Sequence, residues 1–239
     1  MDFEEFKQKL QEESNKIQIK IEEKESRTFY DFMKILLVEN EKVNLTAITE
    51  ENEIIIKHFI DSLTINKYLI NANKILDLGT GAGFPGIPLK IVNKDKEFVL
   101  VDSLNKRIEF LNKVKEKCEL ENLELIHSRA EDLAKNINYR EKFDVVASRA
   151  VANLRTLAEY LLPFVKKEGI CICMKGPNVD NELEEAKNSI NILGGKIEKI
   201  EKIFLKENDM ERNILIIRKI QNTPNKYPRK AGIPTKSPL

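Results

Sequence analysis

The stretch "NKILDLGTGAGFPGIPLKIV", residues 73–92, decides the fold, because an apolar run leads into a carboxylate and then a glycine-rich loop. A loop of this kind after a strand usually cradles a nucleotide-like ligand. One way to align the loop matches Gly81, Gly83 and Gly86 to G-x-G-x-x-G, the dinucleotide fingerprint. A purely structural tight turn is also an interpretation of these glycines.

A second register competes with the dinucleotide fingerprint, and the end of the apolar run at Leu78 favours it. It places the turn at the strand end and puts Pro85 at the start of the next helix, where a missing N–H costs little. It is the register of S-adenosylmethionine binding, which requires no third close-packing glycine because this cofactor has no pyrophosphate. The register, D-x-G-x-G-x-G, uses Asp77, Gly79, Gly81 and Gly83.

Polar residues also follow the next three apolar runs. Asp102 ends "FVLVDS", where a carboxylate takes both ribose hydroxyls, although capping a helix that starts near Asn105 is the alternative. "IHSRAEDL" places the Ala130 N–H and Glu131 at the height expected for the adenine, with a solvated first-turn acid as the alternative for Glu131. "SRAV" lacks the Asn/Asp-Pro-Pro-aromatic motif, which disfavours methylation of exocyclic amines, and it directs Arg149 toward the ligand crevice.

From residue 74 onward, short apolar runs alternate with helical segments. Repeated strand–helix–strand units predict right-handed crossovers and a largely parallel sheet with helices on both faces. The last two runs follow each other without a long helix, so we expect them to pair antiparallel at one edge. The fold class is therefore α/β, a Rossmann-like class I methyltransferase with seven strands. The runs are "KILDLG", "EFVLVD", "LELIHS", "FDVVAS", "GICICMKG", "KIEKIEKIF" and "RNILIIRKI".

The pattern divides the chain into three parts. Residues 1–70 have apolar residues at helical spacing and are predicted to be a cap of about three helices. Residues 71–220 are predicted to be the S-adenosylmethionine-dependent methyltransferase domain. Residues 221–239 are a basic, proline-rich tail without acidic residues, which we expect to be extended and poorly suited to burial. Four prolines deny the tail a helix or internal strand: Pro224, Pro228, Pro234 and Pro238.

Composition sets the broad class of the protein. Of its 239 residues 41% are hydrophobic and 33% charged, which is typical of a globular chain, and a net charge of +1 requires any anionic partner to meet a local patch. No run of about 18 apolar residues exists, and the acidic N-terminus is unlike a signal peptide, so we expect a cytoplasmic protein without membrane contact. Cys118, Cys171 and Cys173 have no ligand partners nearby, which predicts reduced core thiols and no metal site.

Taken together, the motifs resemble those of the RsmG (GidB) family of bacterial small-subunit ribosomal RNA methyltransferases over nearly the whole chain. Only the glycine loop is shared with other methyltransferases. Glu39 is a departure, since an aromatic residue is expected there, and it concerns packing of the cap. The motifs are "NLTAIT" (44–49), "HFIDSL" (58–63), "DLGTGAGFPGIPLKI" (77–91), "VDSLNKRIEFL" (101–111), "SRAEDL" (128–133), "SRAVANL" (148–154), "MKG" (174–176) and "YPRKAGIPTKSPL" (227–239).

The resemblance implies methyl transfer from S-adenosylmethionine to N7 of guanine 527 in 16S rRNA, either as RNA or within a precursor of the small ribosomal subunit. The position of His58 and Asp61 on a cap helix suggests that the cap closes over the substrate side. By the family pattern, five residues line the cofactor site: Gly79, Phe84, Ala130, Glu131 and Arg149.

This chemistry requires no general base. Guanine N7 carries no proton and has an in-plane lone pair, and a sulfonium is already an activated methyl donor. The task of the protein is to hold the reacting atoms in line, which supplies much of the barrier reduction. We therefore name no catalytic acid or base and consider Arg149 and His58 for positioning, with simple packing as the alternative for His58.

An RNA substrate requires a phosphate-binding surface, whose affinity falls with salt. We expect truncation after Ile220 to reduce RNA methylation more than cofactor affinity. One alternative is a tail that is merely solvated, and another is a tail that packs back on the domain, whose truncation lowers thermal stability and weakens both ligands together. Tyr227 is a candidate for stacking on a base. The candidate cations are Lys106, Arg107 and Lys175 near strand ends and Arg229 and Lys230 in the tail.

Three other functions compete with rRNA methylation. A methyltransferase for a small molecule or a protein would turn over fully without RNA. A non-catalytic RNA-binding module would keep only a vestigial loop, but the intact Asp77, Asp102 and glycines argue against decay. An NAD-linked oxidoreductase fits worst, because the dinucleotide register delays the turn.

Overall fold

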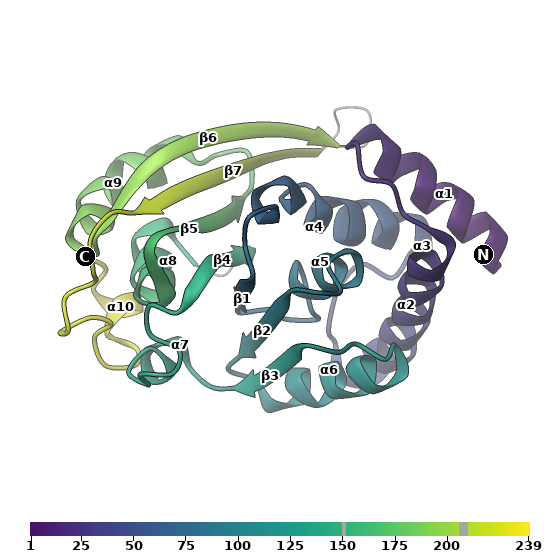
Figure 1. Ribbon diagram of the computed structural model, residues 1–239, viewed down its shortest axis with the longest axis horizontal. Coiled ribbons are helices and arrows are strands. Elements are labelled where there is room, and N and C mark those ends of the chain that lie inside the picture. The colour runs from purple at the N-terminus through teal and green to yellow at the C-terminus, as the bar shows by residue number, and fades with distance from the viewer. Residues whose placement is uncertain (150–151, 206–209) are drawn as a thin grey trace.

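The computed structural model describes residues 1–149, 152–205 and 210–239, and it has one central sheet with helices on both faces (Figure 1). The strands are arranged in the order β3-β2-β1-β4-β5-β7-β6. They are β1 (Lys74–Leu78), β2 (Glu97–Asp102), β3 (Leu123–His127), β4 (Phe143–Arg149), β5 (Val165–Lys175), β6 (Gly195–Leu205) and β7 (Met210–Lys219).

The predicted sheet is confirmed. Strands β3, β2, β1, β4 and β5 pair in parallel, whereas β7 pairs antiparallel with both β5 and β6. β7 lies inside the sheet, and its unbroken run "ILII" suits a strand covered on both faces, while the charged residues that alternate along β6 suit an edge. The connection at 206–209 lies outside the described residues, as do residues 150–151 of the "SRAVANL" motif.

Side chains of the central strands alternate between two apolar layers. Ile75 of β1 belongs to the layer that includes α5, α6 and the cap, and Leu76 belongs to the layer that includes α8 and α9. Cys171 and Cys173 lie fully buried in the second layer with their sulfurs 3.8 Å apart, which confirms the prediction of core thiols. The helices and helical turns between β1 and β6 are α5 (Gly86–Val92), α6 (Asn105–Lys117), α7 (Ala130–Leu133), α8 (Leu154–Leu161), the 3-10 turn η3 (Leu162–Phe164) and α9 (Asp180–Ile192).

The cap is helical, as predicted, and its third helix contains a π-helical turn. π-helical turns are rare in proteins, and those that occur are often found at functional sites. The turn contains His58, which stacks on Phe84 of the glycine loop, and Asp61 follows directly after the turn. The cap elements are α1 (Phe3–Lys16), α2 (Glu23–Val43), α3 (Glu51–Ile54), the π turn η1 (Ile55–Ile60), α4 (Asp61–Leu63) and the 3-10 turn η2 (Asn66–Leu69).

Aromatic rings attach the cap to the glycine loop. Phe59 lies 5.1 Å from Phe29 and 5.6 Å from Phe32, measured between ring centroids. Phe32 in turn lies 5.5 Å from Phe84, which belongs to the loop after β1. Such ring pairs contribute about 0.5–1.5 kcal/mol each beyond their buried area, so the cap is fixed over the loop.

The prediction of an extended tail unsuited to burial is wrong. Tyr227 is only 7% exposed and belongs to the apolar layer of α8 and α9. The Arg140 guanidinium donates to the carbonyls of Thr223 and Tyr227 at 2.8 and 2.9 Å, so the main chain of the tail is bound to the domain. The tail also contains the helical turn α10 (Ile233–Lys236). Pro234 does not prevent this turn, because it stands in the first turn of the helix, where no N–H is required.

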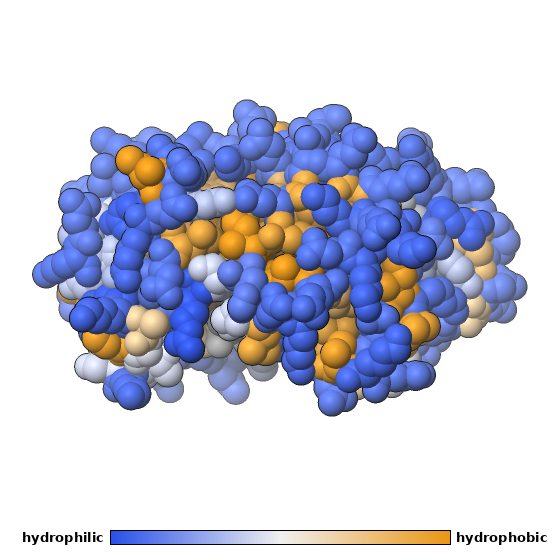
Figure 2. Space-filling view, turned by 90° about the horizontal axis from the view of Figure 1, so that it is seen from below, coloured by the Kyte–Doolittle hydropathy of each residue, from blue (hydrophilic) through white to orange (hydrophobic). Residues whose placement is uncertain are grey.

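Figure 2 shows the molecule from below, from the side of β3 and α6 in Figure 1. Apolar residues form a broken band across the middle of this face, between hydrophilic ones. On β3, which is an edge strand of the sheet, Leu125 and Ile126 are partly buried. None of the helices within the described ranges is long and apolar enough to cross a bilayer.

Candidate functional site

The carboxyl ends of the parallel strands meet at one edge of the sheet. The strand order reverses between β1 and β4, because the chain moves outward through β2 and β3 and returns through β4. Ligands of open α/β sheets bind outside the strand ends at such a switch point. Asp77 lies near the end of β1, Asp102 ends β2 and Arg149 ends β4. The fold therefore brings these three predicted site residues to one edge.

The glycine loop uses the register with Asp77. Gly79, Gly81 and Gly83 have φ of 70°, 62° and 93°, a left-handed conformation that side chains rarely allow. The expectation that no close-packing glycine is required is wrong. A Cβ on Gly86 would lie 2.7 Å from a side-chain carbon of Leu100, because α5 packs directly on β2.

Asp77 offers an unused acceptor inside the loop. Its Oδ2 accepts from the Thr80 hydroxyl at 2.6 Å and from the Gly86 N–H at 2.8 Å. Burial raises the pKa of Asp77 to about 6, against the opposing effect of these two hydrogen bonds. Its Oδ1 is buried without a partner among the described residues, and a buried acceptor left unpaired is costly. The α-amino group of S-adenosylmethionine fits this acceptor.

Asp102 is almost completely buried and both of its oxygens are engaged. The carboxylate accepts from the N–H groups of Gly81 and Leu104, both at 2.9 Å. Leu104 stands directly before the first residue of α6, so Asp102 binds a main-chain N–H at the start of this helix. The alternative that Asp102 caps the helix therefore describes part of the role of Asp102. Arg107, which we expected to meet phosphate, instead forms an ion pair with Asp102 at 3.1 Å and is half-buried.

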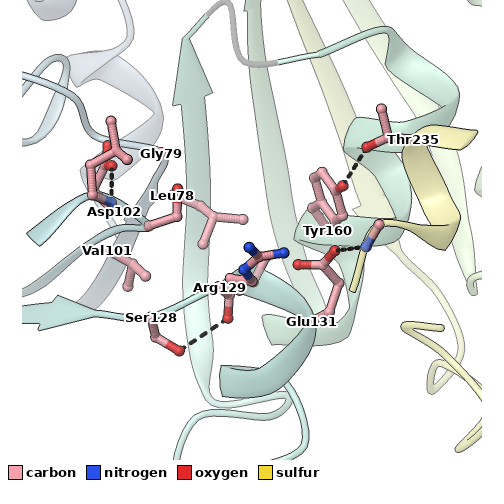
Figure 3. A pocket seen from close by; sticks show the side chains of 13 residues that line it. Leu78, Gly79, Val101, Asp102, Ser128, Arg129, Glu131, Tyr160 and Thr235 are labelled. Atoms are coloured by element: carbon pink, nitrogen blue, oxygen red, sulfur yellow. Dashed lines mark hydrogen bonds between the residues drawn. The ribbon is translucent and has the colours of Figure 1, made fainter. Parts of the chain in front are cut away.

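A cavity of about 390 Å³ adjoins these strand ends (Figure 3). Ala130 and Glu131 line it as predicted, and Glu131 is 5% exposed rather than a solvated acid. Among the lining residues that sequence reasoning missed, three come from α8 and the tail rather than from the strand ends: Tyr160, Gly232 and Thr235. No local motif marks them, since the tail reaches the cavity only after folding back across α8.

Arg149 is held from the cap side. Its Nη1 donates to Asp61 Oδ2 at 3.0 Å and to the carbonyl of Lys57 at 3.1 Å. Its guanidinium lies 5.0 Å from the centre of the Phe84 ring, within range of a cation–π contact. The structure thus joins β4, the cap and the glycine loop at Arg149.

His58 stacks on Phe84 with ring centroids 4.3 Å apart. Arg149 Nη2 and the Lys57 carbonyl oxygen both lie 3.2 Å from His58 Nδ1, and Nε2 lies 2.8 Å from the Thr46 hydroxyl. Burial, aided by the positive charge of Arg149, lowers the pKa of His58 to about 3. His58 is therefore uncharged near neutral pH.

Asp61, which we expected on the substrate side, is engaged by residues of the protein itself. Its side chain is fully buried, and its second oxygen accepts from Arg212 Nε at 3.1 Å. Arg212 lies on β7, far from the glycine loop in sequence, and it was missed as a site residue. One carboxylate thus balances two guanidinium groups, Arg149 and Arg212.

The predicted substrate cations are placed differently from one another. Lys106 is exposed and donates to the Val43 carbonyl at 3.2 Å, and Lys175 pairs with Glu182 at 2.7 Å. Tyr227 is buried, so its ring is not free to stack on a base, and Arg229 is paired with Glu159. Lys230 is exposed. Within the described ranges, no three His, Cys, Asp or Glu side chains could hold a metal ion.

Comparison with known proteins agrees with this geometry. A family model described as rRNA small subunit methyltransferase G (GidB) matches residues 25–215. Two curated proteins named ribosomal RNA small subunit methyltransferase G are similar. That of Clostridium tetani is 50% identical over 94% of this chain and 95% of its own, and that of Clostridium novyi is 52% identical over 93% of each.

Solved structures share the fold at low identity. A SAM-dependent O-methyltransferase of Thermotoga maritima has a TM-score of 0.52 at 15% identity, over 78% of this chain and 72% of that one. TYW2 of M. jannaschii, in complex with AdoMet, has a TM-score of 0.50 at 16% identity, over 66% and 74%. The protein is an S-adenosylmethionine-dependent enzyme. By its family match and its curated relatives, the chain belongs to the rRNA small subunit methyltransferase G family.

Proposed function

We propose that the protein transfers a methyl group to N7 of guanine 527 in 16S rRNA, presented as RNA or within a small-subunit precursor. The observation that carries this proposal is the match to the rRNA small subunit methyltransferase G family, and the state of His58, which stacks on the loop residue Phe84 from the cap, is consistent with it. Burial and the charge of Arg149 lower the pKa of His58 to about 3, so it does not take a proton at neutral pH. An exocyclic amine has to lose a proton on methylation, whereas N7 has none to lose.

The loop and strand ends are the proposed cofactor site. S-adenosylmethionine, when bound, supplies a methyl group on a sulfonium, which keeps the electron pair of the broken bond as N7 donates its lone pair. Asp77 Oδ1 accepts from the α-amino group, since that oxygen is buried without a described partner. Gly79, Gly81 and Gly83 leave space for the methionyl part. Asp102 takes the ribose hydroxyls, which requires Arg107 to yield part of its contact.

The cap and β4 are the proposed site of the target base. Phe84 and the stacked His58 form an aromatic wall, and Arg149 is aimed past it by Asp61 and the Lys57 carbonyl. Because the guanidinium is held on two sides, its remaining N–H groups are preorganised donors for an acceptor edge of guanine. These residues orient the base, and none of them has to move a proton.

The remaining exposed cations are the proposed phosphate contacts. Lys106 and Lys230 fit this role, whereas the structure engages Arg107, Lys175 and Arg229 in ion pairs. We retain the division into a cap (1–70), a methyltransferase domain (71–220) and a tail (221–239) as a proposal. A 16S rRNA substrate also implies work in the cytoplasm, where ribosomal subunits are assembled.

The test is methylation of unmethylated 16S rRNA and of small subunits that contain it, using S-adenosylmethionine labelled in its methyl group. Mass spectrometry of nuclease fragments then locates the label. We expect it on guanine 527, and the matched control is RNA with 7-deazaguanine at that position, which has carbon in place of N7 and should stay unlabelled.

Three outcomes would contradict the proposal. Label on a different base or on an exocyclic amine would change the substrate. Label on protein or on small molecules, with none on RNA, would indicate a different class of methyltransferase. RNA binding without any transfer, in protein that binds the cofactor normally, would indicate a non-catalytic binding module.

A further inference from the structure

We propose that the C-terminal tail is part of the cofactor site, where residues 227–236 close the adenosine end of the cavity. Figure 3 shows the arrangement, with Asp102 and the end of β1 on one side of the cavity and Tyr160, Glu131 and Thr235 on the other. Gly232 also lines this side. The Rossmann-like domain alone therefore leaves the cavity open where the tail now stands.

An ion pair holds the tail in this position. Arg229 donates from Nε to Glu159 Oε1 at 2.9 Å and from Nη2 to Oε2 at 2.6 Å, a two-pronged contact. The main-chain N–H of Arg229 also donates to Oε1 at 2.8 Å. Glu159 lies on α8 and is fully buried, so this carboxylate has its charge balanced only while the tail is docked.

Further contacts connect the tail to residues that line the cavity. The Gly232 N–H donates to Glu131 Oε1 at 3.1 Å, and the Tyr160 and Thr235 hydroxyls lie 2.9 Å apart. Glu131 is the residue that the family pattern assigns to the cofactor. The tail thus fixes the orientation of a carboxylate at the adenine end, and it supplies wall atoms of its own.

Two consequences follow. Undocking the tail should weaken any ligand that contains adenosine, and by linkage such a ligand should stabilise the docked tail by the same free energy. From sequence we expected truncation after Ile220 to reduce RNA methylation more than cofactor affinity, whereas a tail that lines the cavity makes cofactor affinity depend on it directly. The inference concerns adenosine binding alone, so it stands or fails independently of the rRNA target.

The test compares Arg229→Ala with Lys167→Ala. Both variants remove one positive charge, but Lys167 is exposed, does not line the cavity, and its side chain has no described partner. Calorimetry with S-adenosylhomocysteine should give at least about fivefold weaker binding for Arg229→Ala, since several hydrogen bonds lose their geometry together. Lys167→Ala should bind within about twofold of the wild type.

Limited proteolysis provides a second readout on the wild-type protein. Trypsin can cut after Lys226, Lys230 and Lys236, and S-adenosylhomocysteine should slow the release of these tail fragments. Two results would overturn the proposal. One is a folded Arg229→Ala variant that releases its tail readily yet binds within about twofold of wild type. The other, which decides the matter if Arg229→Ala fails to fold, is equal cleavage of the wild-type tail with and without ligand.

Discussion

Replacing Asp61 by Asn should destabilise the protein and impair methyl transfer together. The Asp61 carboxylate is fully buried and accepts from Arg149 at 3.0 Å and from Arg212 at 3.1 Å. Asn keeps the volume but removes the charge, and its amide group then faces a guanidinium that also only donates. Removing one partner of a buried ion pair costs about 3–5 kcal/mol. Since the Arg212 side chain is 26% exposed and regains some hydration, we expect about 3 kcal/mol.

The expected loss is large enough to measure in two assays. For a protein of this size it lowers Tm by roughly 6–12 °C, which thermal unfolding followed by circular dichroism detects. Because Arg149 loses its fixed orientation, kcat on small subunits should fall by about tenfold or more while S-adenosylmethionine still binds. The matched control is Asp95→Asn, at an exposed loop position, which should change the free energy of unfolding by no more than about 0.5 kcal/mol.

A double-mutant cycle makes the reasoning refutable. Arg212→Gln combined with Asp61→Asn should cost less than the sum of the single changes, because the second change removes one of the two charges left uncompensated by the first. An Asp61→Asn protein with the Tm and kcat of the Asp95→Asn control would show that Asp61 does not hold Arg149. Strictly additive free energies in the cycle would show that the buried contact with Arg212 is energetically unimportant.

Three further predictions concern the cofactor loop. Gly81→Val should abolish S-adenosylmethionine binding in calorimetry, because the φ of 62° at Gly81 disfavours a side chain and valine would fill the space for the ligand. The control Gly176→Val, at an open position, should bind the cofactor normally. Equal binding by the two variants would refute the loop assignment. Asp102→Ala should weaken S-adenosylmethionine and S-adenosylhomocysteine in parallel by about 1–3 kcal/mol, and unchanged affinity for either would leave Asp102 with its helix-start role only. The pKa of Asp77 is about 6 in the folded protein and ordinarily 3.8, so the folded state holds this proton more tightly than the unfolded state. The free energy of unfolding of the ligand-free wild type, measured relative to Asp77→Asn, should therefore fall by up to about 3 kcal/mol as the pH rises from about 4 to 6. Parallel curves of unfolding free energy against pH for the two proteins would contradict it.

Much of the fold and half of the site were predictable because they depend on local chemistry. Strand positions follow from apolar runs, whose alternation reflects burial on two faces of a sheet. The glycine loop follows from backbone angles that only glycine adopts easily, and the structure has those angles at Gly79, Gly81 and Gly83. Asp77 and Asp102 follow from the rule that ligands meet the carboxyl ends of parallel strands.

Long-range contacts determine the other residues of the candidate site. Their partners lie far away in the sequence, and no neighbouring motif specifies them. Asp61 and Arg212 are 151 positions apart, and Glu131 and Gly232 are 101 apart. The tail reads as an extended basic segment, because proline and lysine dominate it. The buried carboxylate of Glu159, 70 positions before Arg229, and the Arg140 guanidinium, which binds the Tyr227 carbonyl, show why it folds back. A buried charge has to find its partner in three dimensions, so the sequence by itself determined the loop and the sheet, while the tertiary structure decided which residues complete the site.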